Sequence, residues 1–177
     1  TRNLRWLSAS IFGSVGPALV PQGSSFGRND GANNVVTIYG KYGGESSFSG
    51  AGAGGAATAV AVVSDLLALT QGGRQSEAEE WSPASFVAPP PLPYYLRFIV
   101  KDRPGILASI STAMAKYDVN LDAVLQEPGY PKDRLPFVIT VEPCEEAALL
   151  EALGELNDAD WHAEPPLALP RLMGQDS

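Results

Sequence analysis

A glycine-rich run that leads directly into an alanine- and valine-rich segment is the strongest constraint on how this chain folds. Residues 49–65 read SGAGAGGAATAVAVVSD and carry no charge before Asp65. Each glycine inside a regular element costs about 0.5–1 kcal/mol relative to alanine, so the run is unfavourable within a helix or strand. It therefore predicts a turn followed by a helix over about Ala56–Leu69, whose free N–H groups point back at the glycines.

Two interpretations of this helix start remain open. Free N–H groups at a helix N-terminus accept a phosphate, a carboxylate or a polarised amide, but glycines also let a helix pack tightly on a sheet. The spacing matches neither G-x-G-x-x-G after a first strand nor the P-loop G-x-x-x-x-G-K-[ST], because the run reaches Thr58 without a lysine. The segment is thus predicted as a place of close approach and not as a P-loop.

Composition limits the class of protein. The chain has 177 residues, of which 45% are hydrophobic and 18% charged, as expected for one or two folded domains. The sequence shows no apolar run long enough to span a membrane and no secretory pattern, so we expect a cytoplasmic protein with no membrane partner. The single cysteine, Cys144, and the single histidine, His162, exclude a disulfide framework and a Cys/His zinc cluster.

The net charge of −8 is unevenly distributed. Residues 1–92 carry 5 basic and 6 acidic side chains, whereas residues 93–177 carry 7 and 14. An acidic surface repels a polyphosphate backbone, so nucleic acid is excluded as a partner of the second half. A small zwitterion is compatible with this charge.

A break in composition predicts the domain organisation. Residues 71–93 collect glycines, a short acidic run and four prolines near their end, which predicts a linker whose proline-rich end is extended and semi-rigid. The linker separates a first region, residues 1–70, from a second domain, residues 94–170, and residues 171–177 form a tail.

The first region contains few elements for its length. We expect strands at Arg5–Ile11 and Asn34–Tyr42, with Ser46–Ser49 as a short antiparallel partner of the latter, and then the helix. Most strand edges would be unpaired, so this part is interpreted as the incomplete end of a larger α/β domain. The chain begins with Thr1, and we expect it to be a fragment.

The second domain shows a regular β-α-β-β-α-β order. Strand patterns alternate with two segments whose apolar residues recur at helical spacing. The predicted elements, in chain order, are a strand at Tyr94–Lys101, a helix at Gly105–Tyr117, strands at Val119–Gln126 and Arg134–Val141, a helix at Glu145–Leu156 and a strand at Trp161–Leu169. This order is the ferredoxin-like plan, and the fold class of the whole chain is α+β.

The motif Asp102-Arg103-Pro104-Gly105-Ile106-Leu107, followed by a strand that begins Asp118-Val119-Asn120-Leu121, resembles the ACT regulatory domains. The resemblance covers about Tyr94–Leu169. It implies a small amino acid bound between paired ACT domains, and thus a homo-oligomer, with Asp102 at its ammonium group and the amides of Gly105, Ile106 and Leu107 at its carboxylate. Asn120 is included in this effector group. In an alternative interpretation the domain serves only dimerisation.

The first region resembles the end of the catalytic region of homoserine dehydrogenases. Three segments follow in the family's order, Pro17–Pro21, Asn33–Val36 and Gly50–Leu66. The resemblance implies NAD(P)-dependent interconversion of aspartate 4-semialdehyde and homoserine, and threonine as the feedback effector, although the residues do not rank threonine above methionine, isoleucine or no ligand.

The same resemblance implies that a few glycines approach the cofactor. Gly52, Gly54 and Gly55 take this role, and Thr58 begins the helix behind them. The family's dinucleotide fingerprint and its catalytic lysine have no counterpart here, so no catalytic residue and no metal site is assigned, and the chain alone is expected to be inactive. The alternative from another class is a complete, non-catalytic ACT regulator that binds an amino acid.

Overall fold

A computed structural model describes residues 10–71 and 84–172 in two compact units. Within the described residues, the first unit comprises Val20 to residue 71 together with Ala84. The second unit comprises Ser10–Leu19 and the chain from Ser85 onward. The segment Ser10–Leu19 thus belongs to the second unit, although the sequence places it in the first region.

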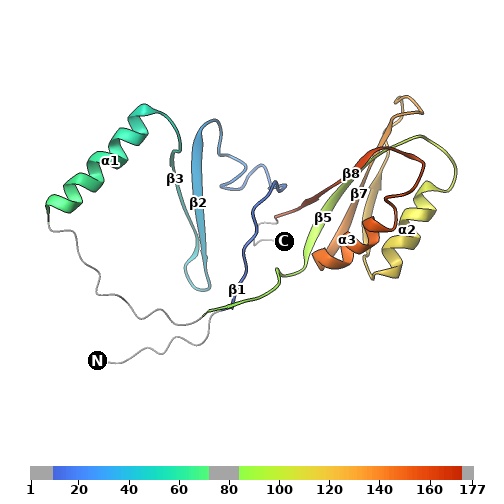
Figure 1. Ribbon diagram of the computed structural model, residues 1–177, viewed down its shortest axis with the longest axis horizontal. Coiled ribbons are helices and arrows are strands. Elements are labelled where there is room, and N and C mark those ends of the chain that lie inside the picture. Colours follow the sequence, from blue (N-terminus) through green and yellow to red (C-terminus); the bar gives the residue numbers. More distant parts are fainter. Residues whose placement is uncertain (1–9, 72–83, 173–177) are drawn as a thin grey trace. The chain divides into compact units, whose positions relative to one another are not determined.

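The first unit consists of a β-hairpin and a helix (Figure 1). Strands β2 (Asn33–Gly40) and β3 (Gly44–Ala51) pair antiparallel over eight residues each. Helix α1 (Gly55–Thr70) follows. The hairpin and the helix were both predicted from the sequence, and β3 extends two residues beyond the predicted Ser46–Ser49 at each end because the register runs from Asn33–Ala51 to Gly40–Gly44.

This unit has no core of its own among the described residues. No residue between Val20 and residue 71 is buried, and α1 exposes large apolar side chains on one broad face. They are Val60, Val62, Val63, Leu66, Leu67 and Leu69. A broad apolar face on a helix packs against other structure in a folded domain, as expected for the end of a larger domain.

The second unit contains a four-stranded antiparallel sheet in the order β6-β7-β5-β8. Its helices, α2 and α3, lie on one side of the sheet (Figure 1). The elements are β5 (Leu92–Val100), α2 (Ile106–Lys116), β6 (Leu121–Leu125), β7 (Leu135–Cys144), α3 (Glu146–Gly154) and β8 (His162–Pro170). Each differs from its predicted bounds by three residues at most, and the ferredoxin-like βαββαβ fold is confirmed.

The core lies between the sheet and its helices. Alternate residues of β5 and β7 point into it, because successive side chains of a strand face opposite sides. Leu96, Phe98 and Ile139 are fully buried there, and α2 and α3 contribute Ile110 and Leu149. All buried residues of the described chain fall between Tyr94 and Trp161, so this unit carries the hydrophobic core.

Backbone hydrogen bonds hold Ser10–Leu19 in the second unit. Strand β1 (Ser10–Ile11) pairs in parallel with β4 (Ser85–Phe86), and Leu19 forms a parallel bridge with Arg171 beside β8. Part of the segment expected to be a linker thus forms a short strand. The remainder of the predicted first strand, residues 5–9, lies outside the described residues, as do the acidic run before Trp81 and the tail from residue 173.

Candidate functional site

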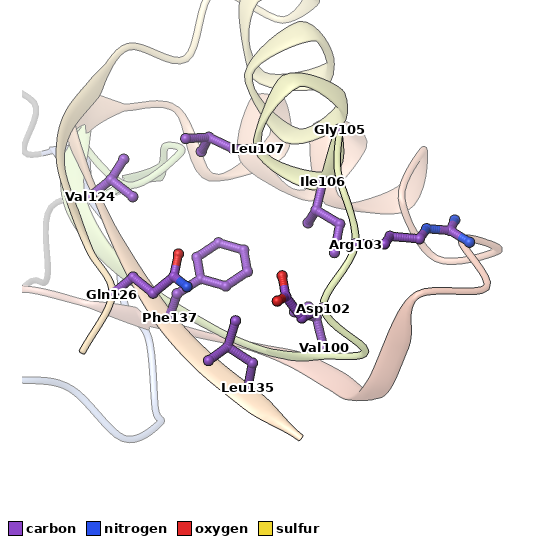
Figure 2. A pocket seen from close by; sticks show the side chains of 10 residues that line it. All are labelled: Val100, Asp102, Arg103, Gly105, Ile106, Leu107, Val124, Gln126, Leu135 and Phe137. Atoms are coloured by element: carbon purple, nitrogen blue, oxygen red, sulfur yellow. The ribbon is translucent and has the colours of Figure 1, made fainter. Parts of the chain in front are cut away.

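A cavity of about 160 Å³ lies at the start of α2, where β5 ends. A cavity of this size suits a small ligand such as an amino acid. Figure 2 shows the ten lining residues, which are Val100, Asp102, Arg103, Gly105, Ile106, Leu107, Val124, Gln126, Leu135 and Phe137.

Gly105 sets the geometry of the cavity's helical side. Its φ of 96° lies in the region that favours glycine, and it forms the N-cap of α2. The first intrahelical bond runs from the Ser109 N–H to the Gly105 carbonyl (2.9 Å). The amides of Ile106 and Leu107 precede this bond and have no acceptor within the helix. They provide the positive end of the helix dipole at the cavity.

Asp102 supplies the negative charge. Its carboxylate points into the cavity (Figure 2) and retains 37% side-chain exposure. The Lys132 ammonium lies 3.8 Å from this carboxylate, and the Asp102 N–H donates to the Lys132 carbonyl at 2.6 Å. Because the Lys132 side chain is 88% exposed, the ion pair is solvated and weak, and the carboxylate remains able to bind a cationic group.

The opposite wall is formed by β6 and the chain just after it. The Gln126 amide faces Asp102 across the ring of Phe137 (Figure 2). Gln126 was not among the effector residues predicted from the sequence. The available signal was strand alternation, because Val124 and Gln126 are two residues apart and face the same side. The wall thus offers an amide donor and acceptor between apolar side chains.

Arg103 lines the cavity with its stem, while its guanidinium points away from it (Figure 2). The guanidinium forms a two-pronged ion pair with Asp160, in which Nη1 donates to Oδ2 at 2.9 Å. The hydrogen bonds from Arg103 hold the pKa of the Asp160 carboxyl below its ordinary value. Asp160 stands two residues before β8, so the pair ties the cavity loop to the start of that strand.

The structure brings together four of the five effector residues predicted from the sequence. Asp102, Gly105, Ile106 and Leu107 line the cavity. Asn120 does not, because it lies beyond the C-terminal end of α2 and lines a separate hollow with Ser111 and Asp118. Within one chain, Asn120 therefore lies apart from the other four, at the far end of the helix.

The glycine run shows two different local roles. A Cβ on Gly52 would clash with the Asn34 side chain, so this glycine lets the chain lie close against β2. Gly54 has φ 116° and forms the N-cap of α1, and a Cβ on Gly54 or Gly55 would meet nothing. Thr58 is bound locally, because its hydroxyl donates to the Gly54 carbonyl at 3.1 Å. Of the three glycines assigned to the cofactor, Gly54 and Gly55 have open space beside them and Gly52 does not.

Other chemical sites are absent from the described residues. Across residues 10–71 and 84–172, no three His, Cys, Asp or Glu side chains are close enough to hold a metal ion. No helix in this part of the chain is long and apolar enough to cross a membrane. Cys144 is buried, and this burial raises the pKa of its thiol.

The second unit is a ferredoxin-like domain with a small cavity, and it follows a hairpin and a helix that have no core of their own among the described residues. Residues 94–160 match the family of ACT domains, and residues 2–67 match the family described as homoserine dehydrogenase. The chain corresponds to the C-terminal portion of homoserine dehydrogenases, the end of the catalytic domain followed by an ACT domain. Both resemblances found in the sequence are confirmed.

Curated relatives agree with this assignment. The homoserine dehydrogenase of Helicobacter pylori is 29% identical over 162 residues, and those of Mycobacterium tuberculosis and Bacillus subtilis are 31% and 32% identical over 166 and 159 residues. These alignments cover 86%, 86% and 83% of this chain. The chain spans only 37%, 37% and 36% of the respective relatives.

Solved structures show the same fold. A homoserine dehydrogenase from Thiobacillus denitrificans superposes with a TM-score of 0.71 at 24% identity, over 89% of this chain and 38% of that one. A homoserine dehydrogenase from S. aureus superposes with a TM-score of 0.55 at 15% identity, over 88% and 37%. At these identities the similarity establishes the arrangement of the elements.

Proposed function

We propose that this chain is the C-terminal part of an NAD(P)-dependent homoserine dehydrogenase whose ACT domain binds a small amino acid as effector. The supporting observation is that the two family matches follow one another in one chain and that the ACT domain contains a cavity of amino-acid size. The reaction is the interconversion of aspartate 4-semialdehyde and homoserine. We place the protein in the cytoplasm, as expected for an enzyme of amino-acid biosynthesis.

The first region supplies a backbone surface to the catalytic site. The cofactor, when bound, accepts or delivers the hydride. The open amides at Gly54 and Gly55 fit a polar group that approaches the start of α1, since no side chain covers them. Gly52 and Thr58 support this turn through Asn34 and the Gly54 carbonyl. This surface cannot hold a dinucleotide alone, so the isolated chain is expected to have no dehydrogenase activity.

In the ACT cavity, the two ends of an amino acid find complementary groups. Its ammonium pairs with the Asp102 carboxylate, and its carboxylate accepts from the Ile106 and Leu107 amides at the positive end of α2. The side chain then lies against Leu135 and Phe137. Among amino acids of this size, threonine is the proposed effector, because its methyl group suits the apolar wall and its hydroxyl suits the Gln126 amide.

The edges of the ACT sheet favour pairing with a second copy. Strand β8 carries Pro165 and Pro166, which cannot donate to a ladder and therefore protect that edge. Strand β6, at the opposite edge, has no proline and exposes Val124 and Leu125 by 45% and 60%. We therefore propose a homo-oligomer formed through the ACT domain on the β6 side, next to the effector cavity.

Titration calorimetry tests the effector assignment. Threonine, isoleucine and methionine are titrated at millimolar concentration into the chain and into Asp102→Asn, which keeps the shape of the side chain and removes its charge. We expect saturable heat for threonine and at least a tenfold loss of affinity in Asp102→Asn, with no loss in the exposed control Glu142→Gln. No heat with any of the three would refute the effector role and leave dimerisation.

The same preparation tests whether the isolated chain is inactive. The chain is assayed for NADPH-dependent homoserine formation from aspartate 4-semialdehyde, with an intact homoserine dehydrogenase as positive control. We expect no turnover by the isolated chain, and turnover above background would overturn this expectation.

A further inference from the structure

The boundary between the two units differs from the boundary between the two family matches. Ser10–Leu19 lies inside the 2–67 match to homoserine dehydrogenase, yet it packs in the unit that contains the ACT domain. The chain leaves that unit at Leu19 to enter the first unit, and it returns at Ser85. The ACT domain is therefore connected to the first region at Leu19–Val20 in addition to the linker.

The Leu19 connection is made by backbone hydrogen bonds and not by side chains alone. The Leu19 N–H donates to the Pro170 carbonyl at 2.9 Å, and the Leu172 N–H donates to the Leu19 carbonyl at 2.8 Å. Leu19 thereby extends the sheet beside the C-terminal end of β8, as an added strand does. A shift of β8 therefore moves the chain that enters the first unit at Val20.

The other end of β8 is tied to the cavity. Arg103, in the cavity loop, is paired with Asp160, and the neighbouring Lys101 N–H donates to the Trp161 carbonyl at 2.8 Å. Strand β8 also pairs with β5 from Tyr94–Pro170 to Val100–His162. One hydrogen-bonded strand thus runs from the cavity loop to Leu19.

We propose that Ser10–Leu19 is the element through which occupancy of the Asp102 cavity changes the first region, with β8 as the strand between them. This inference rests on the proposed effector function of the cavity. A ligand shifts an equilibrium only by contacting its two states differently, and here the contacted element is the loop that carries Asp102 and Arg103. Arg103 is a positioning residue, since its guanidinium points away from the cavity.

Hydrogen exchange on the full chain tests the linkage without any ligand. Arg103→Gln removes the ion pair to Asp160, and we expect the Leu19 and Leu172 amides to exchange about two- to fivefold faster, the range of an exposed ion pair. Lys132→Gln is the matched control, because Lys132 pairs with Asp102 and has no bond to β8. If Arg103→Gln accelerates exchange at residues 162–164 only and leaves Leu19 unchanged, the linkage is refuted.

A second pair of variants tests the Leu19 connection itself. Leu19→Pro removes the N–H that bonds to Pro170, whereas Val15→Pro alters the same segment at a fully exposed side chain. Threonine is the probe. We expect threonine to change the hydrogen exchange of residues 33–70 in the wild type and in Val15→Pro. In Leu19→Pro we expect this change to be lost while the heat of threonine binding remains. Leu172→Pro removes the second bond and serves if Leu19→Pro does not fold.

The outcomes separate the two proposals. If threonine gives no binding heat with the wild type, the effector assignment is refuted. The exchange rates of Arg103→Gln and Lys132→Gln then still decide whether the cavity loop and Leu19 are linked. If threonine binds and still changes the exchange of residues 33–70 in Leu19→Pro and Leu172→Pro, the inference is refuted and the coupling is assigned to the linker. Loss of the response in these variants, with heat retained, supports Ser10–Leu19 as the connection.

Discussion

Replacing Gly105 by alanine isolates the energetic role of the residue that begins α2. Gly105 has φ 96°, and a Cβ at this position would meet no atom within 4 Å. The change therefore introduces backbone strain without a steric clash. Such strain costs about 1–3 kcal/mol, and the reduced entropy of the unfolded chain returns about 0.4–1 kcal/mol. We expect Gly105→Ala to destabilise the ACT unit by about 0.5–2 kcal/mol.

The control is a glycine in the same unit with an ordinary backbone. Gly154 ends α3, its φ lies outside the positive region, and a Cβ there also meets nothing. Gly154→Ala should therefore stabilise the unit by about 0.4–1 kcal/mol. The two substitutions add the same methyl group to open space and differ only in backbone conformation.

Thermal unfolding monitored by circular dichroism measures both changes. For a domain of this size, 1 kcal/mol corresponds to about 4–8 °C in Tm, so the two variants should shift Tm in opposite directions. Calorimetry on the folded Gly105→Ala variant should also show weaker amino-acid binding, because the amides of Ile106 and Leu107 move with the helix start. An unchanged or higher Tm for Gly105→Ala would refute the strain argument.

Further substitutions test other parts of the ACT unit. Asp118 has φ 58° just after α2 and places a carboxylate at the negative end of the helix, so Asp118→Gly should raise the unfolding free energy by about 0.5–1 kcal/mol in chemical denaturation. Hydrogen bonds from Lys116 and Tyr117 lower the pKa of Glu155. Its contribution to stability is present above the unfolded pKa of about 4.3 and is lost as the pH falls through the lower, folded value, so wild type and Glu155→Gln should converge in Tm towards acid pH. Leu149 is 1% exposed, so Leu149→Ala should cost about 2–5 kcal/mol by the same denaturation assay.

Much of the ACT unit was predictable because its local signals agree with its tertiary packing. The apolar spacing of Ile106, Ile110 and Met114 predicts the buried face of α2, and these residues are buried. Pro104 followed by Gly105 marks the helix start within two residues. The cavity loop follows from the same motif, so four of its lining residues were predicted.

What the sequence did not reveal depends on contacts distant in the chain. Gln126 follows the end of β6, and strand alternation places it on the same face as Val124 without showing that this face lines a cavity. Ser10–Leu19 joins the ACT unit through backbone groups of Leu19 and Ile11, and every residue except proline offers the same N–H and C=O. Such pairing leaves no pattern in the side chains, so the sequence assigned this segment to the first region.

The two units differ in how much of their apolar surface they bury. The ACT unit buries its apolar residues between a sheet and two helices, whereas α1 and the hairpin leave Val36, Phe48 and Leu66 exposed by 60%, 66% and 57%. These side chains gain free energy only when further apolar surface covers them. Limited proteolysis should therefore cut within residues 20–71 before it cuts within 94–170. Equal resistance of both regions would show that the first unit is covered in solution, most simply by a second copy of the chain.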